Sequence, residues 1–229
     1  MSEAVRIEPV ENLPPGIIGE RLRQARTAKG VSARAFARSL GLSPSLISQI
    51  ELGKALPSVG TLMAIVTSLG ISLDELFFDP VSQDAVPSGP VGTQPSADPK
   101  GVPGEGGVVL RAPDRRSITL GNNVRWQRLT PDHDYDVDFL YVTYDPGAES
   151  CPEDALMTHS GKEYGLVLEG RLGATVGFVS YELEPGDSIA FESAVPHRFW
   201  TVGDVPTRVV WTVVGRLGVP RFPSNRPSA

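Results

Sequence analysis

A segment of eleven residues, Gly41 to Glu51, constrains the fold more than any other part of this chain. Gly41 can adopt the positive φ of a tight turn, and Pro44 suits the first position of a helix. Ser43, between them, can accept a hydrogen bond from a free backbone N–H at the start of that helix. The segment therefore predicts a three-residue turn followed by a helix that begins at Pro44.

The predicted helix has two chemically different faces. Its apolar side chains share one side at helical spacing, and they are Leu46, Ile47 and Ile50. Its short polar side chains share the other side, and they are Ser45, Ser48 and Gln49. Side chains of this size let a helix enter the major groove of DNA, where Gln is a bidentate partner of adenine. The segment therefore predicts a DNA-reading helix.

Neighbouring segments complete a helical domain. Apolar periodicity, with Ser32 and Ser58 as helix caps, predicts four further helices within residues 17–26, 32–40, 58–69 and 72–77. The short gap between the second and third helices is the spacing of a helix-turn-helix. Residues 17–80 thus predict a compact five-helix unit; the alternative is a bundle that packs against protein instead of DNA.

This unit resembles the lambda-repressor-like (Xre-type) helix-turn-helix family, with Gln49, Glu51, Gly53, Lys54 and Pro57-Ser58 in the family's order. The resemblance implies that the protein binds a double-stranded DNA operator. The residues that would contact the operator at the start of the third helix are Ser43, Pro44, Ser45, Ser48 and Gln49. Arg34 and Lys54 are placed for phosphates or groove edges.

Charge is distributed unevenly along the chain. Residues 17–56 contain seven Lys or Arg against two Glu, whereas the whole chain has a formal net charge of -6. Cations are thus concentrated on the unit that would meet phosphate. The alternative interpretation of such a cluster is a solvated helix face.

Composition changes abruptly after the helical unit. Residues 81–107 are rich in Pro and Gly and lack aromatic, Leu, Ile, Met and Phe residues, so they predict a semi-flexible linker. We expect few contacts to cross it and the two domains to move relative to each other. Residues 1–16 are expected to form an N-terminal arm, and residues 218–229 a C-terminal tail.

The remaining segment, residues 108–217, has short β-rich runs punctuated by Gly and Pro, which is typical of an all-β sandwich or barrel. Its stretches 146–170 and 183–199 resemble the two cupin motifs. The resemblance implies a small double-stranded β-helix, or jelly-roll, barrel with a metal or an organic ligand inside. The whole chain therefore predicts a multidomain α + β protein.

The cupin motifs also imply a set of metal ligands. His159, Glu163 and His197 occupy three ligand positions, while Met157 replaces the first histidine. Residues 157 and 159 point to the same side of a strand, so Met157 would face the pocket with a soft thioether. Three ligands with open positions suit a divalent metal. The alternative is a metal-free barrel in which the histidines hydrogen-bond to Glu163 or to an organic effector.

The effector pocket is expected to contain Met157, His159, Glu163, Tyr164, His197 and Phe199, although aromatics in a small barrel are often core residues. In the run from Asp132 to Phe139, alternating Asp and apolar residues predict a strand with a solvated acidic face. The single cysteine, Cys151, excludes an internal disulfide and fits a reducing compartment.

Together these features predict a cytoplasmic transcription regulator, because the start of the chain lacks a signal peptide and no apolar run reaches membrane-spanning length. We expect a homodimer, since one short helix offers too few contacts for tight binding and two reach half-sites about one DNA turn apart. A small-molecule effector in the barrel would modulate operator binding. The alternatives are a metal-dependent cupin enzyme with a regulatory helical domain, and a repressor whose cupin only dimerises.

Overall fold

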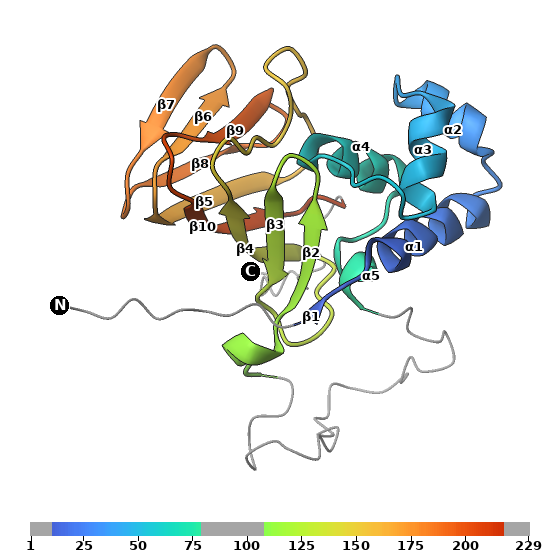
Figure 1. Cartoon of the computed structure of the whole chain (residues 1–229), viewed down its shortest axis with the longest axis horizontal. Coiled ribbons are helices and arrows are strands. Elements are labelled where there is room, and N and C mark those ends of the chain that lie inside the picture. The colour runs from blue at the N-terminus through green and yellow to red at the C-terminus, as the bar shows by residue number, and fades with distance from the viewer. Residues whose placement is uncertain (1–10, 79–107, 218–229) are drawn as a thin grey trace, which may run out of the picture.

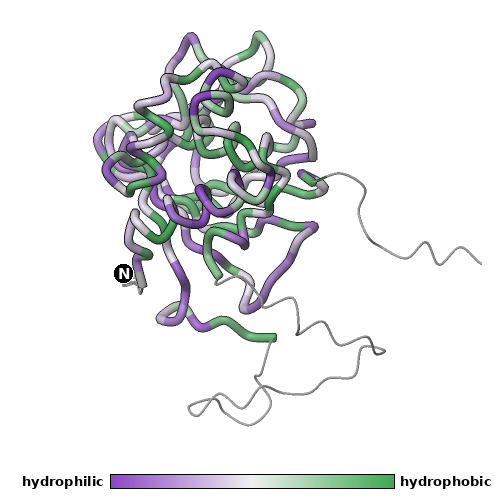
Figure 2. Tube along the Cα trace, turned by 90° about the vertical axis from the view of Figure 1, so that its right-hand side faces the viewer, coloured by the Kyte–Doolittle hydropathy of each residue, from purple (hydrophilic) through white to green (hydrophobic). Residues whose placement is uncertain are grey.

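The computed structural model describes residues 11–78 and 108–217, and Figure 1 shows helices on one side of the molecule and strands on the other. The predicted linker at 81–107, the tail at 218–229 and the first ten residues of the arm lie outside the described residues. Hydrophobic and hydrophilic residues alternate in short runs along the chain (Figure 2). Within the described ranges, no helix is long and apolar enough to cross a membrane.

Five α-helices form the N-terminal part, as the sequence predicts. They are α1 (Pro15–Ala28), α2 (Ala33–Ser39), α3 (Pro44–Glu51), α4 (Val59–Leu69) and α5 (Asp74–Phe77). Ser32, Ser43 and Ser58 each accept a hydrogen bond from a backbone N–H in the first turn of α2, α3 and α4, so the three predicted caps are confirmed. Gly41 has a φ of 67°, as the predicted turn requires.

The strands form two sheets, and all of them except the short β1 come from the C-terminal part of the chain. The strands are β1 (Glu11–Asn12), β2 (Arg116–Leu120), β3 (Val124–Arg128), β4 (Val137–Tyr144), β5 (Lys162–Glu169), β6 (Leu172–Val176), β7 (Val179–Leu183), β8 (Ser188–Glu192), β9 (His197–Thr201) and β10 (Thr207–Val214). The larger sheet has the order β1-β2-β3-β4-β10-β5-β8, and the smaller one has the order β7-β6-β9. The predicted all-β cupin architecture is confirmed.

Two features of the sheets position the pocket. An isolated bridge pairs Met157 with His197 of β9, which brings the loop after β4 to the mouth of the barrel. Met157 and His159 are both buried while Thr158 is exposed, so the expected same-side arrangement is confirmed. The end of the expected arm is also part of the fold, because β1 pairs in parallel with β2.

The expectation that few contacts join the two domains is wrong. The N–H groups of Gly60 and Gly121 donate across the boundary to the carbonyls of Ser150 and Pro57, at 3.0 and 2.8 Å. Arg128 of β3 pairs with Asp74 of α5 at 2.6 Å, and both side chains are at most 1% exposed. In Figure 1, α4 lies between the strands and the α2–α3 pair. The helical domain is thus docked directly on the barrel.

The expected acidic strand face at residues 132–139 is also wrong. Asp138 is buried on the inward side of β4, where its carboxylate pairs with Arg216 at 2.8 Å. Asp134 precedes the strand, and its carboxylate accepts the N–H groups of Asp136 and Val137 in a turn. A strong buried partner therefore overrides the usual tendency of Asp to face water.

Candidate functional site

The polar face of α3 is available to a partner molecule. Ser45, Ser48 and Gln49 are exposed, and their side chains form no hydrogen bond within the described part of the chain. Ile47 and Ile50, on the opposite side, are each 2% exposed. Leu46 is only half-buried, so the packing face is narrower than the sequence predicts. Figure 1 shows α2 and α3 on the side of the helical domain away from the barrel.

A buried ion pair fixes α3 against α1. Arg26 Nε donates to Glu51 Oε1 at 2.6 Å, and an Nη of Arg26 donates to Glu51 Oε2 at 2.8 Å. The hydrogen bonds that Arg26 donates to Glu51 raise the pKa of Arg26 against the opposing effect of burial. A Cβ added at Gly19 would lie 2.3 Å from the Ile50 carbonyl oxygen, so α1 and α3 touch closely at this glycine. Arg26 is therefore a structural residue and adds nothing to the exposed basic surface.

The other predicted DNA contacts surround the polar face. Ser43, Pro44, Arg34 and Lys54 are all exposed, with Arg34 in α2 and Lys54 just after α3. The oxygen of Ser43 already accepts the Leu46 N–H as a cap. Exposed cations elsewhere on the helical domain are Arg23, Lys29 and Arg38. The arrangement offers hydrogen-bonding groups in the centre and cations at the rim, as a DNA-binding surface requires.

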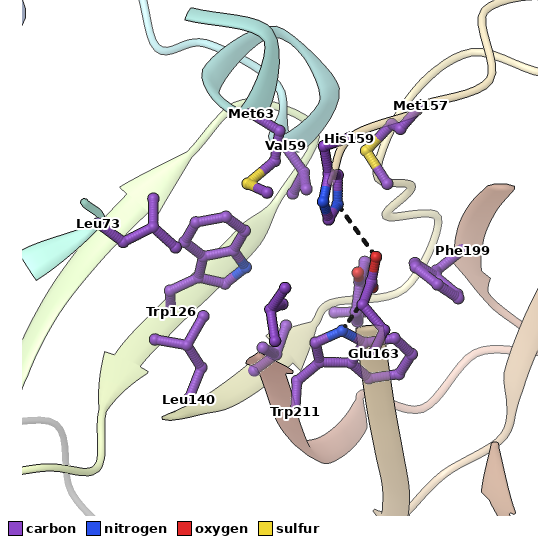
Figure 3. Close-up of a pocket in the computed structure, with 13 residues that line it drawn as sticks. Val59, Met63, Leu73, Trp126, Leu140, Met157, His159, Glu163, Phe199 and Trp211 are labelled. Carbon is purple, nitrogen blue, oxygen red and sulfur yellow. Dashed lines mark hydrogen bonds and ion pairs between the residues drawn. The ribbon is translucent and has the colours of Figure 1, made fainter. Parts of the chain in front are cut away.

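The second candidate site is a cavity between the barrel and the helical domain, drawn in Figure 3. Its volume is about 30 Å³. The lining residues of the barrel are Trp126, Leu140, Val142, Tyr144, Met157, His159, Glu163, Phe199, Trp211 and Val213. The helical domain contributes Val59, Met63 and Leu73. The lining is thus almost entirely apolar, with polar groups concentrated at one point.

That point is the carboxylate of Glu163 on β5, which is 2% exposed. Its Oε1 lies 3.0 Å from His159 Nε2 and 3.2 Å from His197 Nε2. Its Oε2 accepts a hydrogen bond of 2.8 Å from the indole Nε1–H of Trp211. Trp211 can lie over β5 because residue 165 is glycine, where a Cβ would be 2.2 Å from the Trp211 ring. Trp211 therefore orients the carboxylate toward the two histidines.

The two histidines are oriented so that their Nε2 atoms point at Glu163. The Nδ1 of His159 lies 2.9 Å from the Ser160 carbonyl, and the Nδ1 of His197 lies 2.8 Å from the Val195 carbonyl. Because a carbonyl only accepts, each Nδ1 carries a proton, and a neutral ring then directs an Nε2 lone pair at Glu163. Glu163 Oε1 and His197 Nε2 have no hydrogen-bond partner among the described residues. Such a cluster of buried acceptors needs a proton or a cation.

A divalent metal fits this cluster. The three ligand atoms lie within 4.8 Å of one another. Metal–ligand bonds of about 2.1 Å at tetrahedral or octahedral angles put neighbouring ligand atoms roughly 3.0–3.4 Å apart, which matches the Nε2–Oε1 distances of 3.0 and 3.2 Å. Two histidines and one carboxylate form a set suited to non-haem iron and other divalent ions. His159, Glu163 and His197 would hold the ion.

The electrostatics of the cluster favour an ionised Glu163. Burial raises the pKa of Glu163, but the bond from Trp211 and the hydrogen bond and attraction that His159 and His197 supply when they are protonated outweigh it and lower the pKa. Burial lowers the pKa of His197, and the attraction of Glu163 opposes that shift only in part. A carboxylate beside neutral imidazole is the ionisation state in which these groups bind metals.

The structure brings together most of the predicted pocket residues. Met157, His159, Glu163 and Phe199 line the cavity, and His197 contacts Glu163 at its base. Tyr164 is the exception: its side chain is 44% exposed on the outer face of β5. Consecutive residues of a strand point to opposite sides, so Tyr164 faces outward because Glu163 faces inward. The expectation that Tyr164 belongs to the pocket is wrong.

Sequence reasoning missed Trp211, Trp126, Val59 and Met63. The alternation of Val209, Trp211 and Val213 in β10 was a usable signal, since all three are buried. This alternation predicts that Trp211 faces the inside of the barrel. Its hydrogen bond to Glu163, however, depends on how β5 and β10 are paired, which the sequence does not show. Val59 and Met63 have no local signal, because an apolar residue on a helix is explained by the helical core.

Comparisons with known proteins agree with both halves of the structure. The helix-turn-helix family model matches residues 22–76, and the cupin domain model matches residues 140–213. The HTH-type transcriptional regulator PuuR of Escherichia coli is 30% identical over 189 residues, which cover 82% of this chain and 88% of that protein. The uncharacterized HTH-type transcriptional regulator YazB of Bacillus subtilis is 42% identical over 60 residues, or 26% of this chain and 87% of YazB.

A solved structure shows the same fold. The HTH_3 family transcriptional regulator from Vibrio cholerae superposes with a TM-score of 0.59 at 23% identity, over 91% of this chain and 98% of that one. The likeness to PuuR extends through both domains, and the family models place a helix-turn-helix before a cupin domain in the same order as the structure. The chain therefore belongs to the HTH-type transcriptional regulators that join an N-terminal helix-turn-helix to a C-terminal cupin domain.

Proposed function

We propose that α3 reads an operator in the major groove, that two copies of the chain bind together, and that a ligand in the barrel modulates this binding. The observation that carries the proposal is the free polar face of Ser45, Ser48 and Gln49, with the cations Arg34 and Lys54 at its rim. Because the site serves a regulator, we infer no catalytic role for the barrel. A DNA-binding role also places the protein in the cytoplasm.

Variants of two α3-region residues test the DNA contacts. Gln49→Ala should weaken operator binding by about 1–3 kcal/mol and relax the base preference at one position of each half-site. Lys54→Ala should weaken binding to all sequences alike and reduce the salt dependence, since a phosphate contact carries no sequence information. Gel-shift titrations against a selected operator and its single-base variants distinguish the two. An unchanged base preference in Gln49→Ala would exclude base reading by this residue.

The homodimer surface is best supported on the outer face of β5. Tyr164, Leu166 and Leu168 are 40–44% exposed there, beside Val210 of β10, which pairs with Leu166. Lys162 and Glu169 stand at opposite ends of this strand. Two copies of β5 packed antiparallel across a two-fold axis would match apolar residues with each other and Lys162 with Glu169. A symmetric dimer would also present two α3 helices to two half-sites.

Leu166→Glu tests this surface. Two carboxylates facing each other near the two-fold axis should dissociate the dimer, so sedimentation at micromolar concentration should give a monomer. Glu at position 178 is a matched control, since Phe178 is fully exposed on the β6–β7 turn; Phe178→Glu should stay dimeric. A Leu166→Glu protein with the wild-type sedimentation coefficient would place the dimer contacts elsewhere.

A metal-dependent enzyme is the second candidate function, and the His159–Glu163–His197 cluster is the observation that favours it. A metal held there would supply Lewis-acid or redox chemistry, and Trp211 would fix the orientation of the carboxylate. Elemental analysis of the purified protein decides whether the site holds metal. Met157→His should raise metal occupancy if the site binds an ion weakly, because imidazole is a harder ligand than a thioether. A full equivalent of metal in the wild type would justify turnover assays.

A further inference from the structure

The cavity beside Glu163 is much smaller than the binding site of an organic ligand. Its volume of about 30 Å³ exceeds the roughly 10–15 Å³ that a cavity needs to hold one water molecule. Sites for small organic molecules measure roughly 300–1,000 Å³. A water molecule or a metal ion fits this cavity, whereas an organic effector requires one of its walls to move.

One wall of the cavity belongs to the DNA-binding domain. Val59 and Met63, one turn apart on α4, project toward His159 and Trp126 in Figure 3. The opposite walls are strands held in hydrogen-bonded ladders, most of them paired on both sides. Parting those strands would break many backbone hydrogen bonds, whereas α4 is joined to the barrel by few. The α4 wall is therefore the one that can move at the lowest cost in free energy.

The start of α4 is seated tightly on the barrel. The Gly60 N–H donates to the Ser150 carbonyl at 3.0 Å. A Cβ at Gly60 would lie 3.0 Å from Cys151 Cβ and 3.1 Å from Met157 Cγ, closer than ordinary van der Waals contact. Glycine at this position allows α4 to approach Met157 and to close the cavity.

Movement of α4 would carry the DNA-reading helix with it. Four further side chains of α4 do not line the cavity and are at most 2% exposed, namely Leu62, Ile65, Val66 and Leu69. Since these side chains hold α4 within the five-helix unit, the unit must leave the barrel as one body. The position of α3 is therefore fixed by the same contacts that close the cavity.

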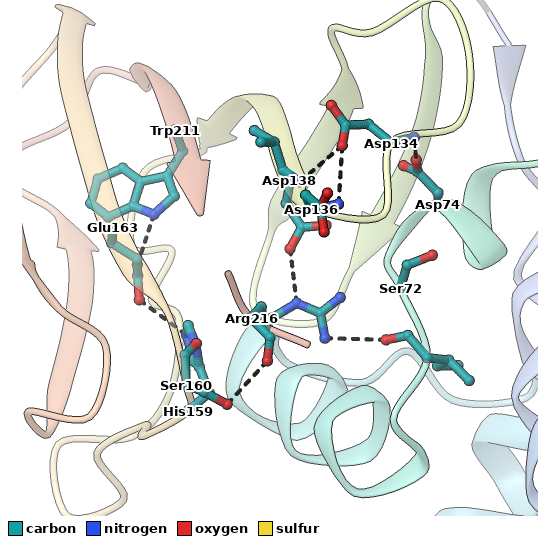
Figure 4. Close-up of polar contacts among 12 residues, drawn as sticks. Ser72, Asp74, Asp134, Asp136, Asp138, His159, Ser160, Glu163, Trp211 and Arg216 are labelled. Carbon is teal, nitrogen blue, oxygen red and sulfur yellow. Dashed lines mark hydrogen bonds and ion pairs between the residues drawn. The ribbon is translucent and has the colours of Figure 1, made fainter. Parts of the chain in front are cut away.

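A polar path also joins the cluster to the helical domain (Figure 4). The Ser160 carbonyl accepts from His159, and the Ser160 hydroxyl donates to the Arg216 carbonyl at 3.0 Å. The Arg216 guanidinium donates to Asp138 at 2.8 Å and to the Ile71 carbonyl, just after α4, at 3.2 Å. A shift of His159 on ligand binding would thus reach the residues that hold the helical domain in place.

We propose that α4 is a reversible cover of the barrel, and that an organic effector and the docked helical domain exclude each other. The inference rests on the proposed function, because it specifies how the barrel ligand regulates DNA binding. The effector enters when the helical domain lifts off, and it then occupies the space of Val59 and Met63. The lining selects a mainly apolar molecule with one polar group directed at Glu163 and the histidines. Its binding would free α3 from its fixed position and shift the population of operator-binding dimers.

A disulfide between α4 and the barrel can test this cover. Cys151 is the single cysteine of the chain, and a Cβ at residue 60 would be 3.0 Å away. Disulfides need a Cβ separation of about 3.5–4.5 Å, so a small outward shift of α4 should allow Gly60→Cys to bond with Cys151 on oxidation. Peptide mass spectrometry of the full-length protein verifies the bond. Gly60→Ser is the matched control, since its side chain has nearly the same size and cannot form the bond.

Access to the barrel is then measured with diethylpyrocarbonate, which acylates neutral histidine and is larger than the cavity. In protein dialysed against a chelator, oxidation of Gly60→Cys should slow the labelling of His159 and His197 by at least about tenfold, because α4 can no longer leave the barrel. A reductant should restore the rate. Gly60→Ser should label at a rate that does not respond to oxidation.

Three results would refute the proposal that α4 covers the barrel. They are the absence of a disulfide, equal labelling of His159 and His197 before and after oxidation, and no labelling in either state. Operator binding by the reduced protein is measured separately by gel shift. A protein that shows redox-dependent labelling but binds no DNA would refute the proposed function while leaving the cover intact. A protein that binds its operator with redox-independent labelling would refute only the cover.

Discussion

Replacement of Arg128 by Met should change the pH dependence of stability as well as the stability itself. Arg128 pairs with Asp74 at 2.6 Å, and both side chains are at most 1% exposed at the junction of the two domains. Burial raises the pKa of Asp74 from 3.8 to about 6, even though the charge of Arg128 acts in the opposite direction. A shift of this size corresponds to about 3 kcal/mol of unfavourable free energy for the ionised carboxyl in the folded state.

The sign of the wild-type effect follows from proton binding. Between pH 3.8 and about 6, folded Asp74 holds a proton that the unfolded chain has released, so the free energy of unfolding falls as pH rises. Above pH 6 both states are ionised, and Asp74 adds no further slope. In Arg128→Met the attraction is gone, so the pKa of Asp74 should rise above 7 and the fall should continue through neutral pH.

Protonation of Asp74 limits how much stability Arg128→Met loses. At pH 6 the difference between the variant and the wild type is close to zero, and at pH 7 the protonated Asp74 of the variant costs roughly 1 kcal/mol more than the ionised Asp74 of the wild type. The difference grows with pH for as long as Asp74 of the variant stays protonated. Losing the buried guanidinium also changes packing and desolvation, but these contributions are independent of pH, so the slope is the measurement that tests the reasoning.

Urea unfolding at pH 6, 7 and 8 gives the slope. Between pH 6 and pH 7, Arg128→Met should lose roughly 1 kcal/mol of stability relative to the wild type, and it should lose no less at pH 8. Arg125→Met is the matched control, because Arg125 lies on the same strand and its partner Asp145 is 3.9 Å away at a partly exposed site. The double variant with Asp74→Asn should also have the wild-type slope. Parallel pH profiles for Arg128→Met and the wild type would show that Arg128 does not control the ionisation of Asp74.

Two further predictions concern single positions. Ser43→Ala should lower the free energy of unfolding by about 1 kcal/mol in urea titrations, because the Leu46 N–H loses its cap, whereas Ser45→Ala on the exposed face should stay within about 0.5 kcal/mol. Gly165→Ala should destabilise by about 1–3 kcal/mol and change Trp fluorescence, since its Cβ would lie 2.2 Å from the Trp211 ring. Gly16→Ala, with nothing within 4 Å of the new Cβ, is its control, and equal stability of both variants would contradict the packing argument.

Local chemistry explains the parts of the fold that the sequence predicts well. A serine cap depends on a few consecutive residues, and Ser32, Ser43 and Ser58 all cap helices as expected. The convergence of His159 and Glu163 also depends on nearby residues in one motif. Such features require no knowledge of which distant segments meet.

The predictions fail where a strand pattern is interpreted without regard to the residues beside or opposite it in the fold. Tyr164 was placed in the pocket although strand alternation alone puts it opposite to Glu163. The alternation of Asp with apolar residues predicts Asp138 on a solvated face, whereas Arg216, far along the chain, provides a buried partner. The first error could be avoided from the sequence, but the second could not, because only the fold brings Arg216 beside β4.

The contact surface between the two domains could not be predicted from composition alone. Asp74 and Arg128 pair across this surface, and Arg216, which pairs with Asp138 within the barrel, donates to the Ile71 carbonyl. In the sequence these charged residues resemble solvated surface residues. Buried ion pairs fix a geometry while adding little net stability, because desolvation offsets much of their attraction. When the domains part, the same groups are well hydrated, whereas an apolar surface would be left exposed. The charged pair therefore defines where the helical domain docks, while an apolar effector would replace the contacts with the barrel lining that Val59 and Met63 lose on undocking.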